Sequence, residues 1–175
     1  MAQHQETFDA RLFRSVMGHF ATGVTVATYR HGGETLGMTA NAFMSVSLVP
    51  PLATLAVRRQ ARFAAAVGPG QRFGINVLAE SQERLSNHFG GRPVAALVPR
   101  FDMHGATPLL PGSLAQLVLR VVAVHEAGDH LLYVGQVEHM ALGAERQPLV
   151  FFSGAHKQVA VHQPPRIAWA SDDGW

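Results

Sequence analysis

The sequence predicts a mainly β protein, built as a closed or partly closed antiparallel barrel with a few flanking helices. About six or seven stretches are apolar or alternating and rich in β-branched residues, as strands are. Short hairpin-type turns separate most of them, and helices do not alternate with them, which disfavours a doubly wound parallel sheet. The 175 residues suit one domain, expected over residues 1–162, with a loosely held tail over residues 163–175.

The first third of the chain predicts one helix and three strands. The helix is amphipathic, with a capping residue at Thr7 or Asp9 and apolar residues four positions apart: Phe8, Leu12, Val16 and Phe20. A strand over residues 23–30 then turns at residues 31–34 and returns to about residue 40. The prolines Pro50 and Pro51 precede an apolar strand over residues 52–57.

The rest of the chain predicts two short helices and four strands around one long excursion. The helices cover residues 61–67 and 80–89, and the strands cover residues 72–78, 115–127, 131–142 and 148–152. Gly128-Asp129-His130 joins the two long strands. Residues 90–111 hold four prolines and several glycines, so we expect a surface excursion there.

Composition excludes several classes of protein. Hydrophobic residues make up 47% and charged residues 15%, which is too apolar for disorder and predicts apolar surface at a subunit interface or around a ligand. The net charge is only +2 without a basic stripe, which disfavours nucleic acid as a partner. No apolar run reaches the ~18 residues of a membrane span, and the first residues lack the apolar core of a signal peptide. We therefore expect a cytoplasmic protein without a membrane partner.

The common motifs for nucleotide, metal and nucleophile chemistry are absent. The stretch GPGQRFG at residues 68–74 is not GxGxxG, and it enters a strand instead of opening a helix. Ten histidines form no HxH, HxxxH or HExxH pattern, so no metal site is predicted. The chain has no cysteine and no GxSxG, which leaves no sequence signal for a catalytic nucleophile.

Two stretches favour a binding site. In GMTANAFMSVSLVPPLATLAV, residues 37–57, short polar side chains stand just ahead of a core strand. These side chains fit a strand end followed by a polar loop. They equally fit a binding site for a polar, planar, phosphorylated ligand, whose phosphate Arg58, Arg59 or Arg62 could bind. Gly128-Asp129-His130 is either an ordinary hairpin turn or a histidine oriented by its neighbouring aspartate.

The sequence resembles the short-chain flavin reductase family on four stretches, over roughly residues 13–152. These are, in order, FRSVMGHFATGVTVAT, GMTANAFMSVSLVPPLATLAV, RFGINVLAESQERLSNHFGG and AGDHLLYVGQVEHM. The resemblance implies an FMN-binding split β-barrel, a homodimer, and the reductase component of a two-component flavin-dependent monooxygenase.

The activity that the resemblance implies is hydride transfer from NADH or NADPH to FMN or FAD, with reduced flavin passed to a partner monooxygenase. The hydride moves directly between the two cofactors, so no catalytic side chain and no metal are expected. Two alternatives stay open. One is a module that holds FMN permanently and passes electrons, and the other is a split-barrel FMN oxidase or a reductase of another substrate.

The resemblance also implies the site residues. A loop over residues 37–47 would hold the flavin ring edge and ribityl chain, Arg62 would approach the phosphate, and Phe89 would face the flavin. His130 would steady the nicotinamide nucleotide, and His156 stands where the family often has a tyrosine at that site. The loop residues expected to bind are Gly37, Met38, Thr39, Ala40, Asn41, Ala42, Ser45 and Ser47.

Overall fold

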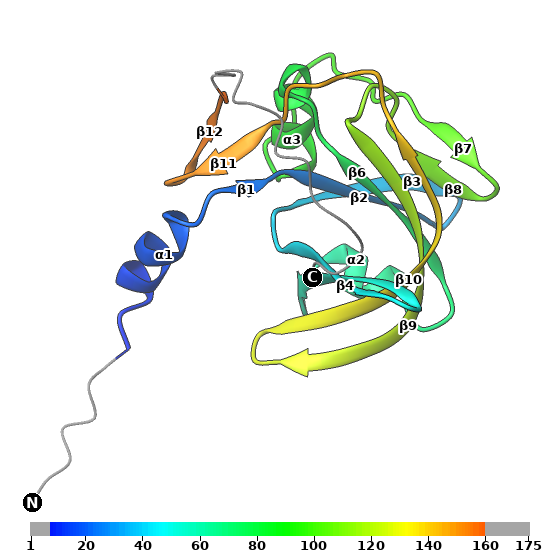
Figure 1. Ribbon diagram of the computed structural model, residues 1–175, viewed down its shortest axis with the longest axis horizontal. Helices are drawn as coiled ribbons and strands as arrows, with labels where there is room; N and C mark the ends of the chain where they lie inside the picture. The colour runs from blue at the N-terminus through cyan, green and yellow to red at the C-terminus, as the bar shows by residue number, and fades with distance from the viewer. Residues whose placement is uncertain (1–7, 160–175) are drawn as a thin grey trace, which may run out of the picture.

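The computed structural model describes residues 8–159, which fold around one seven-stranded antiparallel sheet (Figure 1). The elements in chain order are α1 (Ala10–Gly18), β1 (Thr22–Gly23), β2 (Thr25–His31), β3 (Glu34–Ala40), β4 (Phe43–Leu48), β5 (Pro51–Arg58), α2 (Arg62–Ala66), β6 (Arg72–Val77), a 3₁₀ turn (Glu80–Gln82), α3 (Glu83–Phe89), β7 (Asp102–His104), β8 (Thr107–Leu109), β9 (Ala115–Ala127), β10 (His130–Leu142), β11 (Val150–Phe152) and β12 (Ala155–Lys157).

The main sheet has the strand order β3-β2-β6-β9-β10-β5-β4 and curves around α2 (Figure 1). All of its neighbouring strands are antiparallel. A three-stranded sheet, β1-β11-β12, and the pair β7-β8 complete the β structure. The prediction of a mainly β, antiparallel protein with few helices is confirmed. Closure into a complete barrel is not, because the edge strands β3 and β4 do not pair with each other.

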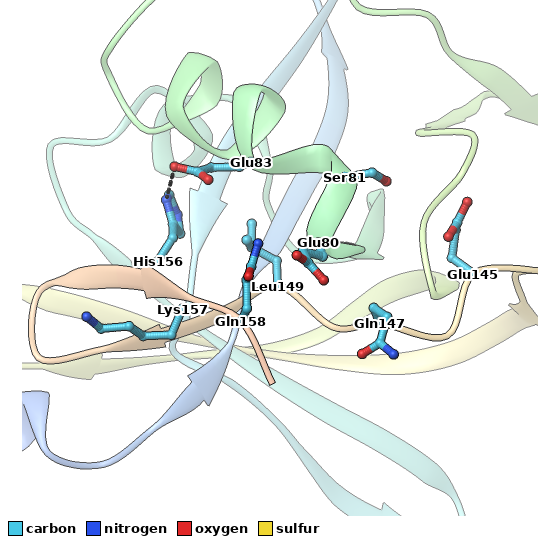
Figure 2. Close-up of a pocket in the computed structure, with 9 residues that line it drawn as sticks. All are labelled: Glu80, Ser81, Glu83, Glu145, Gln147, Leu149, His156, Lys157 and Gln158. Carbon is cyan, nitrogen blue, oxygen red and sulfur yellow. Dashed lines mark hydrogen bonds and ion pairs between the residues drawn. The ribbon is translucent and has the colours of Figure 1, made fainter. Parts of the chain in front are cut away.

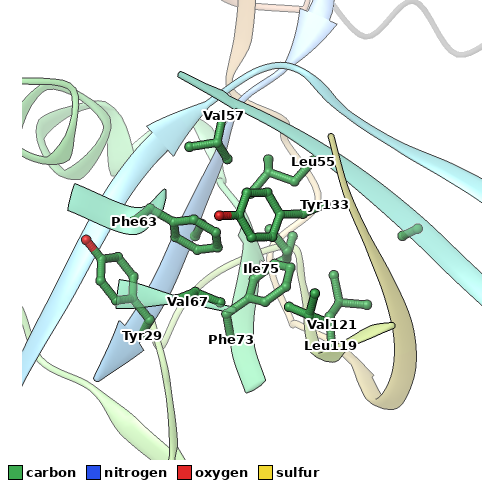
Figure 3. Packing of buried hydrophobic residues seen from close by; sticks show 12 residues of the cluster. Tyr29, Leu55, Val57, Phe63, Val67, Phe73, Ile75, Leu119, Val121 and Tyr133 are labelled. Carbon is green, nitrogen blue, oxygen red and sulfur yellow. The ribbon is translucent and has the colours of Figure 1, made fainter. Parts of the chain in front are cut away.

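The core lies between α2 and the concave side of the sheet (Figure 3). Phe63 of α2 is fully buried, and its ring meets three other aromatic rings edge to face. The ring centroids lie 5.1 Å away for Tyr29, 5.2 Å for Phe73 and 5.1 Å for Tyr133. These partners come from β2, β6 and β10, so the Phe63 ring packs against three strands of the sheet at once.

The N-terminal helix and the hairpins follow the sequence predictions. The Asp9 side chain caps α1 by accepting hydrogen bonds from the backbone N–H groups of Arg11 and Leu12. The turn at Gly32-Gly33 joins β2 to β3, and both glycines have positive φ. Thr7, the alternative capping residue predicted from the sequence, lies outside the described residues.

The expected loop over residues 37–47 is wrong. Nine of these eleven positions lie in strands, and only Asn41 and Ala42 connect β3 to β4. The strands are stabilised by pairing with β2 and β5, and the Thr25 hydroxyl also donates to the carbonyl of Ala40 at 2.7 Å. Small polar side chains suit this stretch because edge strands are partly exposed to solvent.

Two further expectations need correction. Residues 90–111 do not form only a surface excursion, because β8 is buried and Asn76 accepts a hydrogen bond from the backbone of Leu110 at 2.6 Å. The strand expected at residues 148–152 is shorter, and β11 pairs with β1 and β12 outside the main sheet. The expected tail, residues 163–175, lies outside the described residues. Across the described part of the chain, no helix has the length and apolar character needed to cross a bilayer.

We predict that Phe63→Ala lowers the free energy of unfolding by about 3–5 kcal/mol, because it removes the ring at the centre of the core and leaves a cavity. Urea denaturation followed by circular dichroism measures this change. Met140→Ala is the control, since its side chain is 75% exposed and we expect a change within about 0.5 kcal/mol. A loss below about 1 kcal/mol for Phe63→Ala would contradict the central role of this ring.

Candidate functional site

A pocket of about 800 Å³ lies where β3, α3 and the β11–β12 hairpin meet, and we call it the central pocket. Its polar lining residues are Thr39, Asn41, Arg58, Glu83, Ser86, Asn87, Arg92 and His156. Its remaining lining residues are Val24, Ala40, Gly90, Phe151, Gly154 and Ala155. The pocket therefore has a mainly polar lining drawn from segments that are far apart in the sequence.

One face of α3 supplies much of this lining. Glu83, Ser86, Asn87 and Gly90 follow the i, i+3, i+4, i+7 spacing of a single helix face. The Thr39 hydroxyl donates to the carbonyl of Ser86 at 2.8 Å, which ties this helix to β3. These four residues were not predicted from the sequence, although the helical spacing of the polar Glu83, Ser86 and Asn87 could have indicated a polar helix face.

Gly37 lets α3 approach β3 closely. A Cβ added at Gly37 would lie 2.6 Å from an atom of the Phe89 ring, well below any normal contact. Phe89 also packs against the smaller buried cluster that contains Val24, Val26 and Leu78. Gly37 and Phe89 were both expected near the ligand. The structure places them against each other, beside the pocket lining instead of within it.

His156 of β12 is held by two residues of α3. Its Nε2 lies 2.9 Å from the Ser86 hydroxyl, and its Nδ1 lies 3.3 Å from a carboxylate oxygen of Glu83. Its ring also meets Phe151 edge to face, at 5.9 Å between centroids. Figure 2 shows Glu83 and His156 facing each other beside a second pocket of about 500 Å³, which we call the side pocket. These two residues line both pockets.

His130 lies next to the central pocket but does not line it. It begins β10, directly opposite Arg58 of β5, and Arg58 does line the pocket. The Nδ1 atom of His130 is 2.7 Å from a carboxylate oxygen of Asp129. This hydrogen bond is the largest cause that lowers the pKa of Asp129, and the positive charge of Arg58 adds a small effect in the same direction. Arg59 donates to the carbonyl of Gly128 at 2.9 Å, which holds the turn in place.

The expected site residues separate into two groups. Thr39, Ala40, Asn41 and His156 come together in the central pocket. The others lie outside its lining: Gly37, Met38, Ala42, Ser45, Ser47, Arg62, Phe89 and His130. Met38 packs against the main core.

Arg62 begins α2, near Tyr29. Burial raises the pKa of Tyr29, and the charge of Arg62 opposes that rise. The arginines that line the central pocket are Arg58 and Arg92. Arg92 was missed because it follows a glycine pair after a helix, without any local motif.

The lining of the central pocket suits an anionic ligand with ring carbonyls. Arg58 and Arg92 are cations, and Asn41 and Asn87 carry amide groups that can donate or accept. The only carboxylate in this lining belongs to Glu83, which His156 already contacts. Within residues 8–159, no three His, Cys, Asp or Glu side chains are grouped so that they could hold a metal ion.

Comparison with known proteins identifies the family. The model of the flavin reductase like domain matches residues 17–160, so the chain belongs to this family, and the resemblance noted in the sequence is confirmed. The chain is 40% identical over 159 residues to the reductase component of 4-hydroxyphenylacetate 3-monooxygenase from Thermus thermophilus, covering 91% of this chain and 97% of that relative.

Two other comparisons agree with this assignment. An NADH-dependent flavin reductase from a Rhodococcus species is 40% identical over 149 residues, which cover 83% of this chain and 84% of the relative. The solved structure of the flavin reductase PheA2 superposes with a TM-score of 0.81 at 39% identity, covering 88% of this chain and all of that one.

Proposed function

We propose that the protein is an NADH-dependent flavin reductase that reduces FMN or FAD and releases the reduced flavin to a partner flavin-dependent monooxygenase in the cytoplasm. The observation that carries this proposal is the donor-lined central pocket in a chain of the flavin reductase family. The relatives support it, since one is named as an NADH-dependent flavin reductase and another as the reductase component of a monooxygenase.

The flavin would lie in the central pocket. Its volume of about 800 Å³ falls in the range of small-molecule sites. Asn41 and Asn87 would bond the ring carbonyls and N–H group, and Arg58 and Arg92 would bind the phosphate, in the place first given to Arg62. The Thr39 hydroxyl proton is committed to the carbonyl of Ser86, so Thr39 would accept a hydrogen bond from the flavin.

The protein itself would supply binding and orientation. The hydride passes from C4 of the dihydronicotinamide to N5 of the flavin, NADH becomes NAD⁺, and solvent supplies the accompanying proton. Holding the two rings stacked in a fixed geometry makes the hydride transfer effectively unimolecular, which lowers the entropic part of its barrier. His130, oriented by Asp129, would steady the nicotinamide nucleotide beside Arg58.

The assembly we propose is a homodimer of FMN-binding split barrels. The curved sheet is open between β3 and β4, as a split barrel requires. Helix α1 projects away from the rest of the chain in Figure 1 and buries none of its residues. Six large apolar side chains on and beside it are more than half exposed: Phe8, Leu12, Phe13, Val16, Met17 and Phe20. A second copy of the chain would cover this surface.

We predict that purified protein oxidises NADH, measured at 340 nm, only when FMN or FAD is added, because the flavin acts as a substrate that enters and leaves. The two flavins then rank themselves by kcat/KM. A yellow protein without turnover would contradict the proposal and favour permanently bound FMN. Turnover only with another acceptor, tested without oxygen, would favour a split-barrel enzyme with a different substrate.

We predict that His130→Ala raises the KM for NADH about tenfold, while the KM for flavin stays within about twofold. The loss corresponds to one hydrogen bond, about 1–1.5 kcal/mol. Steady-state kinetics with each substrate varied in turn measures both constants. His125→Ala is the control, since this exposed histidine lies on the neighbouring strand β9, away from the pocket. Equal effects on both substrates would remove His130 from the nicotinamide site.

We predict that the protein elutes and sediments at twice the 18.9 kDa of one chain, and that Val16→Glu shifts it toward the monomer. A charge in the middle of the apolar face of α1 is costly to bury. Multi-angle light scattering measures the mass. Arg14→Glu, on the same helix but outside the apolar set, should leave the dimer intact. A monomeric wild-type protein would contradict the proposal.

A further inference from the structure

A third pocket, which we call the outer pocket, lies against another face of α3. Its volume is about 330 Å³. It is lined by Arg84 and Leu85 of α3, by Leu97 and Arg100, which precede β7, and by Leu110, which follows β8. Across the described residues, the outer pocket shares no lining residue with the central pocket. It is therefore a separate space that the proposed flavin site does not use.

The floor of the outer pocket is apolar and is fixed by the core. Leu110 is 1% exposed and belongs to the smaller buried cluster. Leu85 packs against the same cluster, and so does Phe101, which follows Arg100 in the chain. The Phe101 ring also lies 6.3 Å from the ring of Phe89 in α3, between centroids. An apolar group bound on this floor would leave water for a surface that is already formed.

Two positive charges lie at the exposed side of this floor. Arg84 and Arg100 are both exposed, and none of the described residues that line the outer pocket is acidic. The central and side pockets differ in this respect, because Glu83 lines both of them. Within residues 8–159, the arginines in ion pairs are Arg59, Arg72 and Arg120. Arg84 and Arg100 thus have no carboxylate partner in this part of the chain, and a ligand could supply one.

We propose that the outer pocket binds a small carboxylic acid with an apolar body, at a site separate from the flavin. The apolar body would cover Leu85 and Leu110, and the carboxylate would pair with Arg84 and Arg100. A purely polar anion would leave the apolar floor in water, and a neutral apolar molecule would leave the arginines unpaired. The pocket volume is at the lower end for small-molecule sites, which limits the size of the acid. This inference goes beyond the proposed function and does not depend on it.

The test is a ligand-observed NMR titration with octanoate as the probe and octanamide as its matched control. Octanamide has the same apolar chain and a similar shape but no charge. We expect octanoate to bind at least about tenfold more tightly, as one charge-assisted hydrogen bond would provide. Added salt should reduce this difference, because the two arginines are exposed. Equal binding of the two probes, or no binding of octanoate, would overturn the proposal.

Substitutions test whether the binding occurs in this pocket. Arg84→Gln and Arg100→Gln should each weaken octanoate binding about fivefold and octanamide binding by less than about twofold. Val98→Glu adds a negative charge at a lining residue that is 82% exposed, so it should leave the core intact and weaken octanoate binding selectively. Arg11→Gln, at an exposed arginine of α1, is the control and should bind octanoate as the wild type does. Unchanged octanoate binding in both pocket-arginine variants would overturn the proposal.

A central-pocket variant separates this proposal from the proposed function. Arg92→Gln should weaken FMN binding and leave octanoate binding within about twofold, because Arg92 lines the central pocket and not the outer pocket. A loss of octanoate binding in Arg92→Gln as large as that in Arg100→Gln would overturn the separate site. A wild-type protein that binds octanoate but no flavin would overturn the proposed function alone. A wild-type protein that binds FMN but no octanoate would overturn this inference alone.

Discussion

The packing of Phe63 against three strands is the constraint on which the rest of the structure depends. Its ring contacts Tyr29, Phe73 and Tyr133, which lie on β2, β6 and β10. A sheet that meets one buried side chain from three strands has to curve around it, and right-handed twist favours that curvature. The curvature leaves β3 and β4 as the two open edges, connected only by Asn41 and Ala42.

The central pocket forms beside one of these edges because α3 and the β11–β12 hairpin are joined to it by a short chain of hydrogen bonds. Thr39 of β3 bonds the backbone of Ser86, and the side chain of Ser86 bonds His156 of β12. Three segments distant in the sequence are thereby held at fixed separations. A binding site that must align two flat ring systems benefits from such rigid support, since orientation is the main contribution that the protein makes.

The charged residues that line the ligand pocket and the exposed apolar residues lie on different parts of the molecule, and one group of the apolar residues lies at the proposed subunit interface. The arginines and amides line the central pocket, where an anionic nucleotide gains from them. One group of exposed apolar residues lies on and beside α1, which has no buried residue of its own, and another lies on the edge strand β4, at Met44, Val46 and Leu48. A low content of charged residues, 15% of the chain, is consistent with a protein that covers part of its surface by association.

The sequence by itself determined the local elements and the family. Periodicity and turn chemistry predicted the capped α1, the hairpins and the long β9–β10 pair, because these depend on neighbouring residues. The four matching stretches identified the flavin reductase family, which the comparisons confirm. They also pointed to Thr39, Ala40, Asn41 and His156, four residues that line the central pocket.

Only the tertiary structure decided the rest. It turned residues 43–47 of the expected loop into the edge strand β4, because pairing with β5 satisfies their backbone groups. It placed Arg58 and Arg92, instead of Arg62, in the pocket, and it brought Glu83 and Ser86 to His156 across about 70 positions of sequence. No local pattern encodes such a contact, because it arises from the way in which the curved sheet and the small sheet pack around α3.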